Sequence, residues 1–118
     1  IKTLVIGASM NPNRYSNIAI KRLLANGYEV CAVGNKNGVV LGIEIHNSKE
    51  LFQKIHTITL YLNAKNQENY YDYILALKPQ RVIFNPGTEN EILEGLLTKS
   101  NIKFEYSCTL VLLSIGEY

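Results

Sequence analysis

The sequence lacks any long hydrophobic run. Hydrophobic residues make up 47% of the 118 residues, yet no apolar stretch approaches the roughly 20 residues that a membrane-spanning helix needs. No basic segment followed by a longer apolar stretch precedes the first predicted strand, so nothing resembles a secretory signal. We therefore expect a cytoplasmic protein that has no membrane partner.

Cysteine and net charge are also scarce. The two cysteines, Cys31 and Cys108, are far apart and lack the spacing of metal ligands, so free thiols are expected rather than a disulfide framework or a metal site. The formal net charge is only +2, and the basic residues are scattered along the chain. Nucleic acid is therefore not an expected partner.

The chain alternates strand-like and helix-like segments, and its length predicts a single domain over residues 1–118. Five strands are predicted at residues 2–6, 28–33, 57–62, 81–84 and 103–106. Four helices are predicted to begin at Ser16 or Asn17, at Ser48, at Asn66 and at Thr88. Residues 39–45 could form a short strand or an extended connection, and residues 108–115 form an apolar closing segment whose structure stays open. This alternation predicts an α/β, Rossmann-like three-layer sandwich with a parallel sheet.

The hydrophobic pattern of each strand suggests the strand order. The first, second and fourth strands are continuous apolar runs, as interior strands are, whereas residues 57–62 and 103–106 alternate polar and apolar side chains. Placing the alternating strands at the edges gives a five-stranded sheet of order 3-2-1-4-5, which we prefer to the flavodoxin-like order 2-1-3-4-5. The winding then reverses between the first and fourth strands, so a ligand is expected over the loops at residues 7–16 and 85–88.

The loop after the first strand has the residue types of a phosphate site. Gly7 permits close backbone approach, Ser9 and Ser16 supply hydroxyls, Asn11 supplies an amide, and Arg14 can hold a phosphate in a bidentate fork. A helix is predicted to follow directly, and the free amides and dipole of a helix N-terminus attract anions. On residue types alone, an ordinary connection with a solvated arginine is an equal alternative.

Known phosphate-binding fingerprints do not fit this loop. Ser9 and Pro12 occupy the positions where a dinucleotide-binding motif has its second and third glycines, and no Gly-Lys-Ser/Thr ending of a P-loop is present. The second strand is followed by Gly34, Asn35 and Lys36, without the acid that holds the ribose of NAD. Lys36 instead suits a phosphate on the adenosine ribose, as in NADP or coenzyme A, although a lysine in a polar loop is the simpler reading of that residue alone.

Three motifs give the chain a family resemblance. They are Gly7-Ala8-Ser9 with Asn11, Pro12 and Arg14 to Ser16; Asn85 to Asn90; and Cys108 to Leu112. With these motifs the chain resembles the small CoA-binding, Rossmann-like proteins whose fold is shared with the nucleotide-binding domain of the succinyl-CoA synthetase α subunit. Many members of that family carry an Asn-Pro pair where this chain has Gly34 and Asn35.

The resemblance implies coenzyme A as the ligand, with its phosphates at the first loop and its pantetheine running towards the later loops. The implied phosphate contacts are Gly7, Ala8, Ser9, Asn11, Arg14 and Ser16, and Lys36 is a candidate for the ribose phosphate. Asn63 and Lys65 are candidates for the adenine site. Asn85, Pro86 and Gly87 are implied as the opposite wall.

Residues suited to catalysis are few. His46 and His56 lie away from the expected ligand edge, and no Ser-His-Asp arrangement, metal triad or carboxylate pair can be assembled. We therefore favour non-catalytic binding of CoA or an acyl-CoA, with a regulatory role, a larger acyl-CoA enzyme as partner and a homodimer as further hypotheses. A small NADP-linked oxidoreductase and an interaction domain with a vestigial nucleotide site are the alternatives. Cys108 is either a buried apolar residue or a thiol at the ligand edge.

Overall fold

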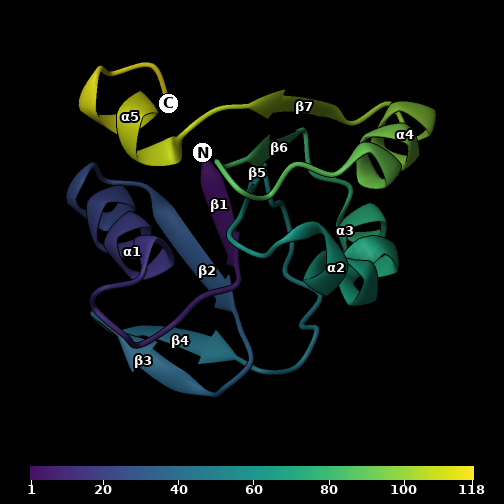
Figure 1. The fold of residues 1–118 in the computed structure, drawn as a ribbon. Helices are drawn as coiled ribbons and strands as arrows, with labels where there is room; N and C mark the ends of the chain where they lie inside the picture. Colours follow the sequence, from purple (N-terminus) through teal and green to yellow (C-terminus); the bar gives the residue numbers. More distant parts are fainter.

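The computed structural model describes all residues, 1–118, and contains one seven-stranded sheet (Figure 1). The strand order is β3-β4-β2-β1-β5-β6-β7. The strands are β1 (Lys2–Ile6), β2 (Glu29–Val33), β3 (Gly38–Val40), β4 (Ile43–His46), β5 (Thr57–Leu60), β6 (Arg81–Phe84) and β7 (Lys103–Tyr106). All neighbouring strands pair in parallel except β3 and β4, which form an antiparallel hairpin. The expected α/β, Rossmann-like class is confirmed, but the prediction of five strands is wrong.

Helices cover both faces of the sheet. They are α1 (Tyr15–Ala25), α2 (Ala64–Gln67), the 3-10 turn η1 (Glu68–Tyr70), α3 (Tyr71–Leu77), α4 (Glu91–Lys99) and α5 (Thr109–Ser114). One core cluster joins α1 and α5 to the sheet through Ile20, Leu23 and Leu113. The other joins α3 and α4 through Ile74 and Leu97, and Figure 1 shows these two pairs of helices on opposite sides of the sheet. None of the helices has the length and apolar character that crossing a membrane requires.

The predicted order 3-2-1-4-5 is wrong, because the hairpin of β3 and β4 changes the environment of β2. Strand β4 pairs in parallel with β2, with Ala32 opposite Ile45 and Val33 opposite His46. The outer edge of β2 is therefore paired with β4. Its continuous apolar run is explained without placing the third predicted strand beside it. The five predicted strands follow the order 2-1-3-4-5 that the sequence had disfavoured.

The alternating pattern of residues 57–62 belongs to an interior strand. Thr57 and Thr59 of β5 are fully buried. The Thr59 hydroxyl is 2.8 Å from that of Thr109 and accepts a hydrogen bond of 2.7 Å from the Asn85 amide, while Thr57 accepts a hydrogen bond of 3.1 Å from Arg81. Buried hydroxyls that are hydrogen-bonded cost little, so polar alternation did not mark an edge here.

The predicted helix at residues 48–55 does not form. Residues 47–56 are irregular, and Lys54 has a left-handed backbone with φ 58°. Phe52 reaches the core without a helix by packing edge-on against the His46 ring, with 5.6 Å between ring centroids. The Tyr73 hydroxyl donates to the Glu50 carbonyl, which holds the segment against α3.

Two helices are capped by other residues than those predicted. The Asn63 side chain, not that of Asn66, caps α2 by accepting a hydrogen bond of 2.9 Å from the Asn66 N–H. Asn90 caps α4, because the Thr88 hydroxyl is already used in a 2.7 Å hydrogen bond to the Asn85 carbonyl. Helix α1 begins at Tyr15, so Ser16 and Asn17 lie inside its first turn rather than capping it.

Candidate ligand-binding site

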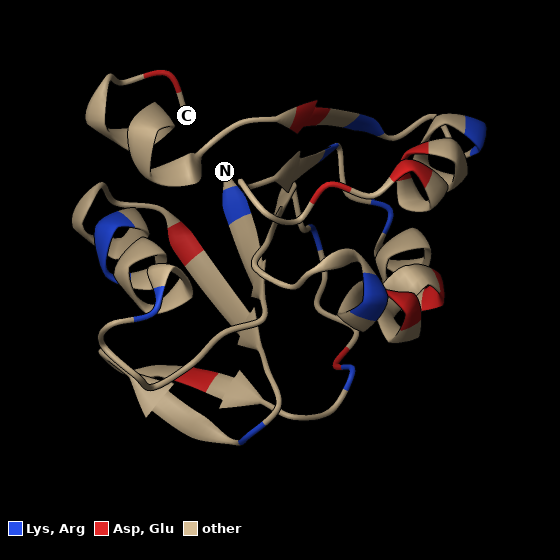
Figure 2. Ribbon diagram, viewed as in Figure 1, with Lys and Arg blue, Asp and Glu red and all other residues tan.

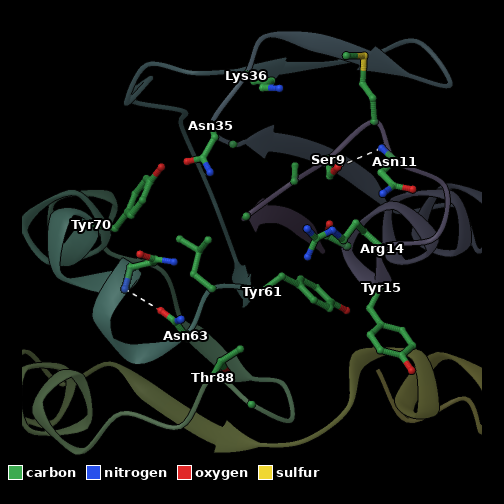
Figure 3. Close-up of a pocket in the computed structure, with 18 of the residues that line it drawn as sticks. Ser9, Asn11, Arg14, Tyr15, Asn35, Lys36, Tyr61, Asn63, Tyr70 and Thr88 are labelled. Atoms are coloured by element: carbon green, nitrogen blue, oxygen red, sulfur yellow. Dashed lines mark hydrogen bonds between the residues drawn. The ribbon is translucent and has the colours of Figure 1, made fainter.

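A cavity of about 730 Å³ lies at the carboxyl ends of the central strands (Figure 3). Its walls come from the connections that follow β1, β2, β5 and β6. The direction of winding reverses between β1 and β5, which are neighbours in the sheet, and not between β1 and β6 as the sequence suggested. Such a reversal point is where open α/β sheets bind ligands.

The cavity brings together most residues of the predicted site. Its lining contains Gly7, Ala8, Ser9, Asn11, Arg14, Ser16, Lys36, Asn63, Pro86 and Gly87. Lys65 and Asn85 lie outside the lining, as do Cys108 and both histidines. The lining also contains residues that the sequence did not single out, namely Met10, Tyr15, Gly34, Asn35, Tyr61, Leu62, Asn66, Tyr70 and Thr88.

The loop after β1 is held in place by its own polar groups. The N–H groups of Gly7 and Ala8 both donate to the Val33 carbonyl, at 2.9 and 3.0 Å. Further along, the Ser9 hydroxyl accepts a 3.0 Å hydrogen bond from the Asn11 N–H. These amides are occupied within the protein, whereas the N–H groups of Ser9 and Met10 have no acceptor in it.

The start of α1 is open to an anion. Arg14 precedes the helix and no side chain caps it. The backbone N–H groups of Tyr15 and Ser16 have no hydrogen-bond acceptor in the protein, and no acidic residue lies in the first turn. Free amides and the helix dipole favour negative charge at such a position.

Glycines let the connections that form the cavity approach one another closely. Gly7 has a φ of +91°, and a side chain there would begin 2.9 Å from the Tyr61 carbonyl oxygen. At Gly34 a side chain would begin only 2.3 Å from the carbonyl oxygen of Ala8. Any larger residue at either position would push neighbouring connections apart, so these two glycines set the floor of the cavity.

The charge of the lining is positive. Arg14 and Lys36 are exposed, their side chains form no ion pair, and none of the 19 lining residues is acidic.

A second hollow of about 360 Å³ shares Asn35 and Tyr70 with the main cavity. It adds Lys49, whose ammonium lies 5.5 Å from the centre of the Tyr70 ring. Figure 2 shows basic residues on the connections after β1 and β2.

Tyr61 combines a place in the lining with a buried hydroxyl. Its N–H donates to the Ile6 carbonyl at 2.9 Å, which extends the pairing of β5 with β1. Burial raises the pKa of the Tyr61 hydroxyl to about 12, and this buried hydroxyl has no hydrogen-bond partner in the protein. The hydroxyl therefore stays protonated and neutral at physiological pH.

Asn85 is a structural centre beneath the far wall. Its side chain is buried and donates to the Thr59 hydroxyl at 2.7 Å and to the Leu60 carbonyl at 2.9 Å. Its side-chain oxygen accepts a 2.8 Å hydrogen bond from the N–H of Thr109. Asn85 thus connects β5, β6 and the start of α5, and its neighbours Pro86 and Gly87 face the cavity instead.

Gln67 joins two walls of the cavity, and the sequence analysis missed it. Its fully buried amide donates to the carbonyls of Leu62 and Thr88, each at 2.7 Å, and accepts a 2.9 Å hydrogen bond from Asn90. Leu62 and Thr88 belong to the cavity lining. Gln67 lies four residues before Tyr71 and so falls on the predicted apolar stripe. A polar residue on such a stripe indicates a buried, hydrogen-bonded side chain, and this was the signal that could have identified Gln67.

No group of three or more His, Cys, Asp or Glu side chains is gathered as a metal site would require.

The profile of the CoA binding domain family matches residues 2–114, nearly the whole chain. The chain belongs to this CoA-binding domain family. The resemblance noted in the sequence is thereby confirmed.

Solved structures similar to this CoA-binding domain agree with the fold. An uncharacterised protein of known crystal structure is 50% identical, with a TM-score of 0.96, and the match covers 99% of this chain and 97% of that one. A hypothetical protein from Pyrococcus horikoshii OT3 is 26% identical (TM-score 0.84, covering 92% and 78%). A conserved hypothetical protein from Pyrococcus furiosus is 28% identical (TM-score 0.83, covering 93% and 97%). No match to this chain was found among the curated proteins.

Proposed function

We propose that this domain binds coenzyme A or an acyl-CoA and does no chemistry on it. The observation that carries the proposal is the charge of the cavity, which has Arg14 and Lys36 in its lining and no acidic residue. Coenzyme A carries a diphosphate and a ribose phosphate, so it needs cations and free amides at two separate places. The family supplies the general ligand class.

The diphosphate is assigned to the start of α1. The Arg14 guanidinium can form two parallel hydrogen bonds with phosphate oxygens, and the free N–H groups of Tyr15 and Ser16 lie next to it in the chain. Together these groups replace the water that a phosphate gives up on binding. The ribose phosphate is assigned to Lys36, at the end of β2.

The pantetheine is assigned to the part of the cavity between Tyr61 and Pro86–Thr88. In Figure 3, Lys36 and Thr88 lie at opposite ends of the view and Tyr61 lies between them. The cavity therefore extends from the proposed ribose phosphate site, past Arg14, to the connection after β6. Asn63 and Asn66 remain candidates for contacts with the adenosine.

A binding role is favoured over catalysis by the chemistry of the lining. It contains no His, Cys, Asp or Glu side chain, which are the commonest general acids, bases and nucleophiles. A protein that holds CoA unchanged would act as a carrier, as a regulator, or as a partner of an acyl-CoA enzyme. We propose that residues 1–118 do so as one cytoplasmic domain.

A thermal-shift titration of the purified protein tests this function. CoA and acetyl-CoA should raise the melting temperature, because a ligand that binds only the folded state stabilises it by about 2.7 kcal/mol at 100 times its Kd. NAD and ATP serve as controls and should leave it unchanged. A shift with NADP instead would indicate the oxidoreductase, since Lys36 could hold the phosphate of its adenosine ribose. No shift with any of these ligands would favour the vestigial nucleotide site.

A further inference from the structure

One carboxylate touches the lining of the cavity. Both side-chain oxygens of Glu89 accept hydrogen bonds from the Gly87 N–H, at 3.0 and 3.1 Å. Gly87 belongs to the lining, and no other acidic side chain forms a hydrogen bond or ion pair with a residue of the lining. A fixed negative charge therefore stands immediately behind the wall formed by the connection after β6.

The chain segment that forms this end of the cavity carries no cation of its own. Residues 82–98 contain three acidic residues, Glu89, Glu91 and Glu94, and no lysine or arginine. Figure 2 shows acidic residues at the start of α4, whereas the basic residues of the cavity lie on the connections after β1 and β2. The charge of the site thus changes sign along its length.

The start of α4 does not offset this negative charge with free donors. The Asn90 side chain accepts hydrogen bonds from the N–H groups of Ile92 and Leu93, at 3.1 and 3.2 Å. Glu91 and Glu94 lie in the first turn, where they oppose the positive end of the helix dipole. An anion at this helix start would meet carboxylates rather than unpaired amides.

The wall leaves room beside Glu89. Gly87 has a φ of +90°, and a side chain there would meet no heavy atom within 4 Å. A small group attached to the thiol end of the ligand can therefore extend past Gly87 without a steric collision. The space available does not distinguish one small acyl group from another, so the charge of the acyl group becomes the property that affects binding.

We propose that Glu89 makes the site prefer free CoA and acyl-CoAs whose acyl group is uncharged over acyl-CoAs that carry a second carboxylate. The inference rests on the proposed function, because it takes the thiol end of the ligand to lie near Gly87. An acyl group that ends in a carboxylate places a second negative charge beside Glu89, whose position is held by two hydrogen bonds. Two like charges about 4 Å apart in water oppose binding by about fivefold, and salt screens part of that repulsion.

Isothermal titration calorimetry with butyryl-CoA and succinyl-CoA tests the inference, because the two ligands differ mainly in a terminal carboxylate. Wild-type protein should bind succinyl-CoA about fivefold more weakly than butyryl-CoA at low ionic strength. In Glu89→Gln, which keeps a hydrogen-bond acceptor for Gly87, the ratio should fall close to one. Glu91→Gln removes the same charge two residues further on, where the side chain forms no hydrogen bond to the lining, and should keep most of the wild-type ratio.

The outcomes separate this inference from the proposed function. If wild-type protein binds CoA and shows equal affinity for the two acyl-CoAs, the role of Glu89 is overturned and CoA binding stands. If Glu91→Gln lowers the ratio as much as Glu89→Gln does, the contact with Gly87 is not responsible and the inference is again overturned. If neither CoA nor either acyl-CoA binds, both proposals fail.

Discussion

The two ends of the parallel strands carry an arginine each, and the two arginines have opposite surroundings. At the amino ends, Arg81 donates to the Thr57 hydroxyl at 3.1 Å, pairs with Glu105 at 3.4 Å, and lies over the ring of Tyr118, 4.7 Å from its centre. At the carboxyl ends, Arg14 is exposed, and its guanidinium forms no ion pair or hydrogen bond within the protein.

This difference separates a structural pole from the proposed binding pole. Most polar groups that stabilise the fold are paired with one another, because an unpaired buried group costs free energy. In Arg81, Nε and Nη1 are paired and the buried Nη2 is not. Donors that serve a ligand stay unpaired in the free protein and are kept near water. Substitutions at the two poles should therefore act on different quantities, the free energy of unfolding at one and the affinity for ligand at the other.

Gln67→Leu has the largest expected effect, because it should lower both the free energy of unfolding and the affinity for CoA. The change leaves the carbonyls of Leu62 and Thr88 without their buried donor and the Asn90 amide with only its hydrogen bond to Tyr71, which should lower the free energy of unfolding by roughly 3 kcal/mol. Affinity for CoA should fall as well, because two walls of the cavity lose their connection. Urea denaturation and calorimetry measure the two effects. Gln80→Leu, at an exposed position, is the matched control and should change neither.

Arg14→Ala should weaken CoA binding by about 1.5–3 kcal/mol, because it removes a charge-assisted hydrogen bond to phosphate. The free energy of unfolding should stay within about 0.5 kcal/mol of wild type, since the side chain has no partner in the protein. Arg22→Ala, in the helix that follows Arg14 but outside the lining, controls for the loss of charge. Unchanged affinity in folded Arg14→Ala would remove this arginine from the site.

Arg81→Met should have the reverse effect. Loss of the hydrogen bond to Thr57, the pair with Glu105 and the contact with Tyr118 should lower the free energy of unfolding by about 2 kcal/mol. CoA affinity, measured under conditions where the variant is folded, should match wild type. A loss of affinity as large as that of Arg14→Ala would contradict the separation of the two poles.

Lys36 tests one contact of the proposed binding pole, the contact with the ribose phosphate. Wild-type protein should prefer CoA over 3'-dephospho-CoA by up to about 1 kcal/mol, the usual value for an exposed charge pair. Lys36→Met should bind the two compounds equally, because the residue that distinguishes them is gone. Competition calorimetry gives the ratio directly. Equal affinities in the wild type would show that Lys36 does not contact that phosphate.

The smallest expected effect is on the pH dependence of stability at the structural pole. Burial, followed by the nearby charge of Arg81, lowers the pKa of His56 below its ordinary value of 6.5. The folded protein then binds fewer protons than the unfolded chain, so the stability that neutral His56 provides is present above pH 6.5 and is lost as pH falls through its lowered pKa. Denaturation curves of His56→Gln should depend less on pH in this range than those of wild type.

The sequence was sufficient for strands that clear breaks bound at both ends. The predicted ranges of β1, β6 and β7 match the structure, because β-branched and aromatic residues there are bounded by clear breaks. The strand order could not be predicted from these patterns. It depended on the hairpin at residues 38–46, whose turn places Leu41 and Gly42 at positive φ, and a leucine gives no local sequence signal for that conformation.

The candidate site was predictable where residues follow a strand directly. Gly7 to Ser16 and Lys36 could be located because carboxyl ends of parallel strands share one edge of a sheet. Tyr61 was missed because the predicted strand ran to residue 62 and so included it. Gln67 was missed although a polar residue on the apolar stripe of its helix gave a signal. Asn85 was placed at the correct connection, but its side chain points into the protein, where it binds Thr59 and Thr109. The roles of these residues in binding stay predictions.

The hairpin that reordered the sheet also decides how the sheet ends. One outer strand, β3, has only three residues, and the other, β7, has four and carries Lys103 and Glu105. Long, flat and uncharged outer strands recruit other chains through their unpaired backbone groups, whereas short or charged ones resist this. The protein can therefore keep an unpaired, exposed binding edge at its strand ends while neither lateral edge offers a template for aggregation.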